Sequence, residues 1–156
     1  MSEIENVIDH GIRAHAPKTM NLAEMPAYAR RQPSADNPQI PSLSPSDIQD
    51  VVEYLYSLGG RQRAPEAAAR GRDIYAGRGA CYDCHSSDGR GDGAIGAPNL
   101  TDGIWLYGDS RADLIDTLEH GRRGACPAWG RQLGAKAVRE LAVYVYTLSH
   151  GGAQRP

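Results

Sequence analysis

The residues with the clearest chemical potential are two cysteines and a histidine in the segment Cys81-Tyr82-Asp83-Cys84-His85. Two thiols at this spacing reach the two vinyl groups of one porphyrin edge as thioethers, and the histidine that follows then lies under the iron. The same pentapeptide could be a redox Cys-x-x-Cys pair or half of a zinc site. A zinc site needs a second ligand pair, for which only Cys126 and scattered histidines remain. A thioredoxin-like motif would follow a strand, and no strand is predicted before this segment. The segment therefore favours covalent haem attachment, with His85 as an iron ligand.

The composition sets limits on what surrounds this motif. A chain of 156 residues forms one domain or two small ones, and 18 glycines and 10 prolines predict many loops. With only 40% hydrophobic residues, a large apolar cofactor would help to fill the core. A net charge of −2 gives no reason to expect nucleic-acid binding. The sequence has no run of about 18 apolar residues that would span a membrane, and its N-terminus lacks the features of a signal peptide.

Helical periodicity and capping residues predict five helices separated by long loops. Ser46 is the predicted N-cap of the second helix, Pro65 suits the first turn of the third, and Ser110 and Gly121 bound the fourth. Residues 77–110 are expected to be mostly loop. No segment alternates convincingly as a strand, so the predicted fold class is all-α. The helices are expected at about 3–13, 46–59, 65–76, 110–120 and 135–149.

An internal repeat relates the start of the chain to its end. IENVIDHGIRA resembles LIDTLEHGRRG and pairs His10-Gly11 with His120-Gly121, and MPAYARR (25–31) resembles CPAWGRQ (126–132). DVVEYLYSLGG (50–60) resembles ELAVYVYTLSHGG (140–152) in the same order. The first copy has no counterpart of residues 65–110, so we expect its apolar stripes to pack on the haem-binding part or on another chain.

The helices on either side of the motif resemble those of the class I cytochrome c fold. In that fold the first and last helices cross where a small residue meets an aromatic one, and Gly71 would allow the last helix, with Leu141 and Tyr144, to approach closely. Pro98 resembles the proline whose carbonyl accepts a hydrogen bond from the ligating histidine and fixes its ring. The expected fold is therefore a cytochrome c domain with long loops around a covalent haem.

A closer resemblance is carried by three segments, GDGAIGAPNLTDGIWLYG (91–108), HGRRGACPAWG (120–130) and ELAVYVYTL (140–148). Together they resemble the second haem domain of the dihaem subunit, subunit III, of cbb3-type cytochrome c oxidase. Residues 1–60 resemble the latter half of that family's first haem domain, with Met25 at its axial-methionine position. The resemblance implies an N-terminally truncated member with half of a degenerate first domain at 1–60, a linker at 61–64 and a complete domain at 65–152.

The resemblance also implies which residues bind the haem. Cys126 stands where the family has an axial methionine, so His85 and Cys126 are the predicted iron ligands, with water and Met25 as alternatives to Cys126. Arginines 111, 122, 123 and 131 could pair with haem propionates. The predicted cofactor-binding residues are Cys81, Cys84, His85, Pro98, Asn99, Leu100, Trp105, Tyr107, Cys126 and Trp129.

The function that the resemblance implies is electron transfer rather than catalysis. One haem c would relay single electrons from a donor cytochrome c toward the catalytic subunit of the oxidase. The chain would work with other oxidase subunits on the periplasmic side of the bacterial inner membrane, tethered by a helix present only in the untruncated parent. The alternatives are a sulfur-redox cytochrome with a His/Cys-ligated haem, as in thiosulfate dehydrogenases, and a remnant that serves as an interaction surface.

Overall fold

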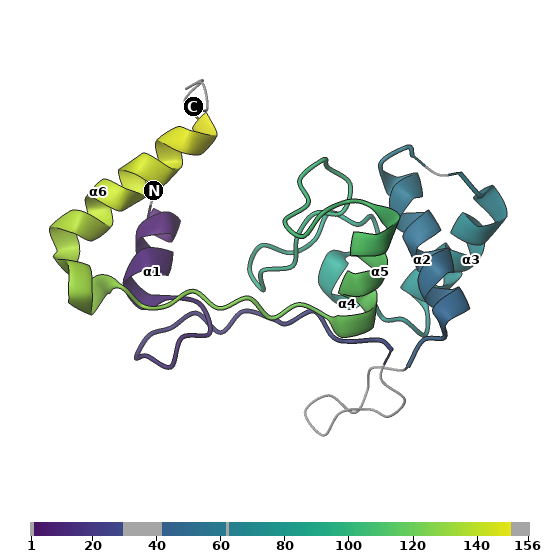
Figure 1. Cartoon of the computed structure of the whole chain (residues 1–156), viewed down its shortest axis with the longest axis horizontal. Coiled ribbons are helices and arrows are strands. Elements are labelled where there is room, and N and C mark those ends of the chain that lie inside the picture. Colours follow the sequence, from purple (N-terminus) through teal and green to yellow (C-terminus); the bar gives the residue numbers. More distant parts are fainter. Residues whose placement is uncertain (1, 30–41, 62, 151–156) are drawn as a thin grey trace. The chain divides into compact units, whose positions relative to one another are not determined.

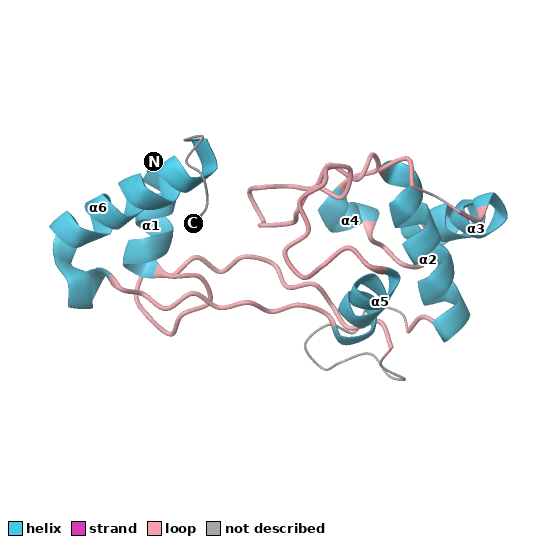
Figure 2. Cartoon of the chain, turned by 45° about the horizontal axis from the view of Figure 1, so that its top comes forward, coloured by secondary structure: helices cyan, strands magenta, loops and turns pink. Residues whose placement is uncertain are grey.

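The computed structural model describes residues 2–29, 42–61 and 63–150. The residues that it describes form six helices and isolated bridges but no strand, which confirms the all-α prediction. Figure 1 shows the helices in chain order, and Figure 2 shows how much of the chain between them is loop. The helices are α1 (Ser2–His10), α2 (Pro45–Leu58), α3 (Pro65–Ala76), α4 (Tyr82–His85), α5 (Arg111–His120) and α6 (Gly130–His150).

The chain divides into two compact units, each built from both copies of the repeat. Unit 1 comprises Met1–Leu22 and Gly124–Pro156, and unit 2 comprises Ala23–Arg123. Residues 23–58 of the first copy therefore share a unit with the Cys-x-x-Cys-His segment of the second. The two units do not coincide with the predicted domains at 1–60 and 65–152. The division into those two domains stays a prediction.

Unit 2 holds the main hydrophobic core, whose members come from α2, α3, α5 and the loops between them. Val51 and Val52 on α2 and Tyr75 on α3 are at most 1% exposed, and Cys81 of the motif belongs to the same cluster. Each fully buried aliphatic side chain contributes about 1.5–3 kcal/mol to folding. The core residues are Tyr28, Leu43, Ile48, Val51, Val52, Leu55, Ile74, Tyr75, Cys81, Leu114 and Leu118.

The N-termini of α2 and α5 carry the same cap. The Ser44 hydroxyl accepts a hydrogen bond from the Asp47 amide, and the Asp47 carboxylate accepts one from the Ser44 amide. Ser110 and Asp113 form an equivalent capping box on α5. The prediction that Ser46 caps the second helix was wrong, because Ser44 has the serine-to-acid spacing of a capping box and Pro45 occupies the first turn.

α3 packs against α2, and the two helices lie side by side in Figure 1. A Cβ on Gly71 would overlap the backbone oxygen of Asp50, so the absent side chain permits the close crossing. Tyr75 packs edge-to-face on Tyr54, with ring centroids 5.1 Å apart. Gly71 thus allows the predicted close approach, but the expectation that its partner is the last helix was wrong. The expectation that the first copy packs on the haem-binding part is confirmed for α2.

Unit 1 consists of α1, α6 and the segments that join them to the rest of the chain. α6 packs against α1, with Val138 and Ala142 buried. The helix begins at Gly130, before the predicted start at 135, and kinks at Gly134, whose φ is +74°. Other apolar side chains on α6 remain exposed, including Leu141 at 40%, Tyr144 at 60% and Leu148 at 61%.

Each unit contains an antiparallel bridge between one copy of the repeat and the other. In unit 1 the Ile12 and Cys126 amides each donate to the other residue's carbonyl at 2.9 Å. In unit 2 the Met25 and Arg122 amides do the same at 3.0 Å. Ile12 corresponds to Arg122 in the repeat and Met25 corresponds to Cys126. The two bridges are therefore equivalent, and each joins a residue of the first copy to a residue of the second.

Candidate haem-attachment site

The Cys-x-x-Cys-His segment forms a single helical turn, α4, within the stretch at 77–110 that is mostly loop, as expected. The amides of Cys84 and His85 donate to the carbonyl of Cys81 at 3.3 and 2.9 Å. The turn thereby places Cys81 and Cys84 one helical turn apart, with both thiols free. Cys81 is buried and Cys84 is half-buried.

The imidazole of His85 is buried and held at one nitrogen. Its Nδ1 lies 3.0 Å from the carbonyl oxygen of Pro98, as predicted. If Nδ1 carries the proton and donates to this carbonyl, the Nε2 lone pair is available to a metal. Burial lowers the pKa of His85, with the Pro98 hydrogen bond opposing, so the neutral form that ligates iron prevails at neutral pH.

The loop after the motif sets the position of the Pro98 carbonyl. Asp92 and Ala97 exchange backbone hydrogen bonds at 3.0 and 2.9 Å, and the Gly91 amide donates to the His85 carbonyl at 2.9 Å. Gly91 has a φ of +76°, and a Cβ there would press on the carbonyls of Ala97 and Pro98. This glycine therefore allows the loop to fold tightly enough to reach the His85 ring.

Tyr28, a residue of the first copy, lies close to Cys81. The sequence did not predict this contact. The Tyr28 hydroxyl donates to the Gly79 carbonyl at 2.8 Å and lies 3.9 Å from the Cys81 sulfur. Burial is the main cause that raises the pKa values of both Tyr28 and Cys81. The repeat could have pointed to Tyr28, because the shared -Pro-Ala-aromatic pattern aligns it with Trp129, which was a predicted site residue.

The remaining predicted site residues fall into two groups. Pro98, Asn99, Leu100, Trp105 and Tyr107 lie in unit 2 with the motif, whereas Cys126 and Trp129 lie in unit 1. The Asn99 side-chain oxygen accepts hydrogen bonds from the Thr101 amide and hydroxyl, both at 2.8 Å. Leu100 and Trp105 pack against the cluster that contains Cys81. Tyr107 is about half exposed, and the Arg122 guanidinium stacks on its ring at 4.6 Å.

Trp105 provides an independent test of whether this environment fits a haem. Its indole Nε1 is buried and has no hydrogen-bond partner in the described part of the chain. A buried donor without an acceptor costs about 1–3 kcal/mol. A bound group with an acceptor, such as a haem propionate, would satisfy it. The free thiols, the oriented His85 and this unpartnered donor all fit a covalent haem.

Of the four arginines considered for the propionates, three form ion pairs with protein carboxylates. Arg111 pairs with Glu53, Arg122 with Asp116 at 2.6 Å and Arg123 with Glu24 at 2.8 Å. Arg131 lies in unit 1. Pairing of any of the four with a propionate stays a prediction.

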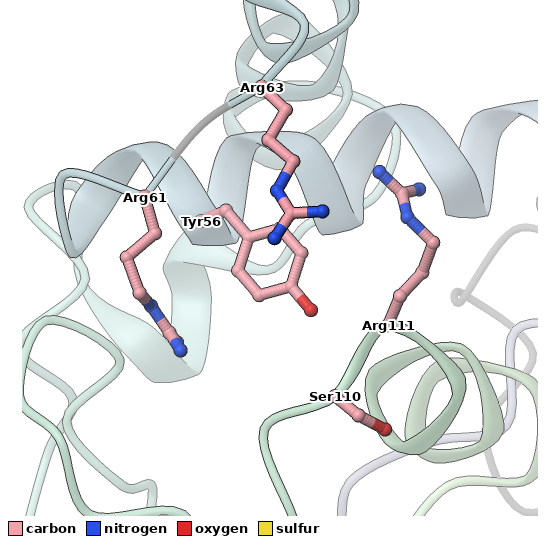
Figure 3. Close-up of a pocket in the computed structure, with 5 residues that line it drawn as sticks. All are labelled: Tyr56, Arg61, Arg63, Ser110 and Arg111. Atoms are coloured by element: carbon pink, nitrogen blue, oxygen red, sulfur yellow. The ribbon is translucent and has the colours of Figure 1, made fainter.

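A separate pocket of about 300 Å³ lies in unit 2 and includes none of the motif residues (Figure 3). Arg61 stacks on the Tyr56 ring at 5.0 Å and pairs with Asp109 at 2.7 Å, and Arg111 is engaged by Glu53. We assign this pocket no part in holding the cofactor. Its lining residues are Tyr56, Arg61, Arg63, Ser110 and Arg111.

Comparison with known proteins identifies the family of this chain. The family model described as cytochrome c oxidase, cbb3-type, subunit III, matches residues 66–145. The chain belongs to this subunit III family. Membership implies covalently bound haem c as the cofactor, in agreement with the arrangement around Cys81, Cys84 and His85.

Curated relatives carry the similarity beyond the matched region. The cbb3-type cytochrome c oxidase subunit FixP of Azorhizobium caulinodans is 36% identical over 152 residues, which cover 97% of this chain and 47% of the relative. Subunit CcoP of Cereibacter sphaeroides is 36% identical over 151 residues, with 97% and 48% covered. Subunit FixP of Bradyrhizobium diazoefficiens is 42% identical over 110 residues, with 70% and 37% covered.

The chain spans about half the length of the curated relatives FixP and CcoP that it matches along nearly all its length. Among the residues that the structure describes, no helix combines the length and apolar character needed to cross a lipid bilayer. The subunit III comparisons lend no support to the sulfur-redox and remnant alternatives.

Proposed function

We propose that unit 2 holds one covalently attached haem c and transfers single electrons as part of a cbb3-type oxidase. The observation that carries the proposal is the helical turn of Cys81, Cys84 and His85, with His85 Nδ1 at 3.0 Å from the Pro98 carbonyl. One haem is proposed because the sequence contains one Cys-x-x-Cys-His segment. When bound, the haem supplies a one-electron Fe(III)/Fe(II) couple.

The chain's own residues would hold and orient this group. Cys81 and Cys84 would form the two thioethers, and His85 would ligate the iron through Nε2, with its ring fixed by the Pro98 carbonyl. The buried Nε1 of the Trp105 indole, which has no hydrogen-bond partner in the described residues, would donate to a propionate. Asn99, Leu100 and Tyr107 shape the same side of the unit. For the sixth position, Cys126 and water remain candidates from the sequence, beside Met25.

The partners follow from the relatives, which are named as subunits of a cbb3-type cytochrome c oxidase. This chain would accept electrons from a donor cytochrome c and pass them to the catalytic subunit, on the periplasmic side of the inner membrane. With a protein side chain as the sixth ligand the iron would have no open position for a substrate, so the chain would transfer electrons and not itself catalyse a reaction.

The test is covalent haem content after periplasmic expression with a cytochrome c maturation system. Intact-protein mass spectrometry and a pyridine haemochrome assay should give one haem per chain. Cys84→Ala should remove one thioether and change the haemochrome band, whereas Cys126→Ala should leave covalent attachment unchanged. A mature chain without covalently bound haem would overturn the proposal.

A further inference from the structure

We infer that Met25 of the first copy, rather than Cys126 of the second, supplies the sixth ligand of the haem attached at Cys81 and Cys84. The structural basis is the exchange between the copies, through which residues 23–58 complete the part of the chain that carries the motif. This inference rests on the covalent haem attachment proposed above. It concerns only which segment covers the second face of the iron.

The segment around Met25 is fastened to the haem-binding part at several points. Met25 and Arg122 exchange backbone hydrogen bonds at 3.0 Å, and the Tyr28 amide donates to the Leu118 carbonyl at 2.8 Å. The Tyr28 side chain reaches Gly79, two residues before Cys81. Met25 itself packs against the hydrophobic cluster that contains Cys81 and that Leu100 and Trp105 also contact. Met25 thus packs on the same hydrophobic cluster as Cys81, one of the two cysteines proposed to bind the haem.

The segment around Cys126 is fastened in the same way, but to the other copy. Cys126 exchanges backbone hydrogen bonds with Ile12, and its thiol lies 3.7 Å from the Pro127 carbonyl. A Cβ on Gly11 would collide with the Cys126 backbone, just as one on Gly121 would collide with that of Met25. Gly11 of the first copy is therefore in close contact with the Cys126 loop of the second copy, and Gly121 of the second copy with the Met25 loop of the first.

Charged residues explain why α2 rather than α6 packs on α3. Glu53 is 2% exposed, accepts hydrogen bonds from the amides of Arg63 and Ala64 at 3.2 Å, and pairs with Arg111. It therefore binds the start of α3 and the start of α5 at once. The residue at the equivalent position of α6 is Val143, which cannot form these bonds. An apolar side chain in place of Glu53 would lose all three of these contacts.

A second contact distinguishes the two helices in the same sense. Asp47 pairs with Arg78, which follows α3, at 2.5 Å, and the equivalent residue of α6 is Ala137. Asp50 binds Arg70 through two hydrogen bonds of 2.7 Å. Its α6 equivalent, Glu140, faces Lys136 on its own helix at 3.8 Å. Arg70 on α3 and Arg78 just after it thus pair with two aspartates of α2, and only Asp47 has an uncharged equivalent on α6.

The apolar residues of the two helices show the outcome of this choice. Val51 and Leu55 are 1% and 7% exposed on α2, whereas their α6 equivalents, Leu141 and Val145, are 40% and 42% exposed. Positions that α2 uses for packing are therefore left uncovered on α6. Substitutions at Val51 and Leu141 form a matched pair that reports which helix completes the haem-binding part.

The identity of the sixth ligand has a direct spectroscopic consequence. A methionine thioether is neutral and keeps the haem potential high, whereas a cysteine thiolate adds negative charge and favours the ferric iron. Methionine is also the longer, more flexible side chain. With Met25 bound, the wild-type protein should show a low-spin spectrum with the His–Met band near the red end of the ferric spectrum.

The decisive experiment compares conservative substitutions in the haem-loaded chain. Met25→Leu should abolish the His–Met band and lower the potential, while Cys126→Ser and the control Met20→Leu should leave both unchanged. If Cys126→Ser alone alters the spectrum, or if neither Met25→Leu nor Cys126→Ser does, the inference is wrong. Covalent haem content is measured in every sample, so a chain without haem counts against the proposed function and not against the choice of ligand.

The matched helix variants test the exchange itself. Val51→Asp should cause loss of the low-spin spectrum, because it buries a carboxylate between α2 and α3. Leu141→Asp, at an already exposed position, should retain the wild-type spectrum and thermal stability. The reverse pattern, with Leu141→Asp disrupting the haem spectrum, would show that α6 completes the site and would overturn the inference even if Val51→Asp failed to fold.

Discussion

The Nδ1 atom of His85 lies 3.0 Å from the carbonyl oxygen of Pro98, and this carbonyl belongs to a loop that folds tightly around Gly91. Gly91→Ala places a Cβ against the Ala97 and Pro98 carbonyls at a positive φ, so we expect a loss of about 1–3 kcal/mol in the free energy of unfolding. Denaturant unfolding of the haem-loaded chain measures it. Gly93→Ala, with no atom within 4 Å of the new Cβ, is the control and should change stability little. Equal effects of the two substitutions would refute the role given to Gly91.

The buried hydroxyl of Tyr28 ties the first copy to the motif. Tyr28→Phe leaves the Gly79 carbonyl without this donor while preserving the ring, and should destabilise the protein by about 1–2 kcal/mol. Tyr82→Phe, in a side chain that is 43% exposed, should have almost no effect. Both are measured by urea unfolding, and a neutral Tyr28→Phe would show that the hydroxyl does not hold the two segments together.

Glu53 should be among the most sensitive polar positions in the chain. Glu53→Gln removes the buried charge that faces Arg111 and retains one acceptor for the Arg63 and Ala64 amides. We expect a loss of about 2 kcal/mol, limited by the partial exposure of Arg111. Glu140→Gln removes an exposed carboxylate on α6 and should cost less than about 0.5 kcal/mol. Comparable losses in thermal unfolding would contradict the structural difference between the two helices.

The contact between Asp47 and Arg78 should make stability depend on pH in the acid range. The hydrogen bond from Arg78 is the largest cause that lowers the pKa of Asp47, to about 2 from an ordinary value of 3.8. A lowered folded pKa stabilises the protein above the unfolded pKa, and this stabilisation is lost as the pH falls from about 4 to about 2.

Asp47→Asn retains an acceptor for the Ser44 cap and removes the charge. It should cost a few tenths to about 1 kcal/mol at pH 6, because the pair is partly exposed, and much less near pH 2. Unfolding curves at the two pH values measure this. In an Arg78→Met background the difference at pH 6 should disappear, and its persistence there would assign the effect to the cap.

Sequence reasoning recovered the local structure better than the pairing of the helices. Pro65 and Ser110 mark the starts of α3 and α5 where the structure has them, because capping depends on adjacent residues. The partner of α3 could not be found in this way, since α2 and α6 carry the same apolar pattern. The difference lies in Asp47 and Glu53, whose partners Arg78 and Arg111 are distant in the sequence.

The short connection between α2 and α3 also gives their pairing an advantage in time. Only residues 59–64 separate the two helices, so they can dock as a helical hairpin as soon as α3 has formed. Helices of this size form within about a microsecond. The end of α6 follows the end of α3 by 74 residues (150 − 76), which takes roughly 4–15 s at a synthesis rate of about 5–20 residues per second. A chain that emerges from its N-terminus, at the ribosome or on the periplasmic side of the membrane, presents α3 to α2 before α6, and this order favours the exchanged pairing.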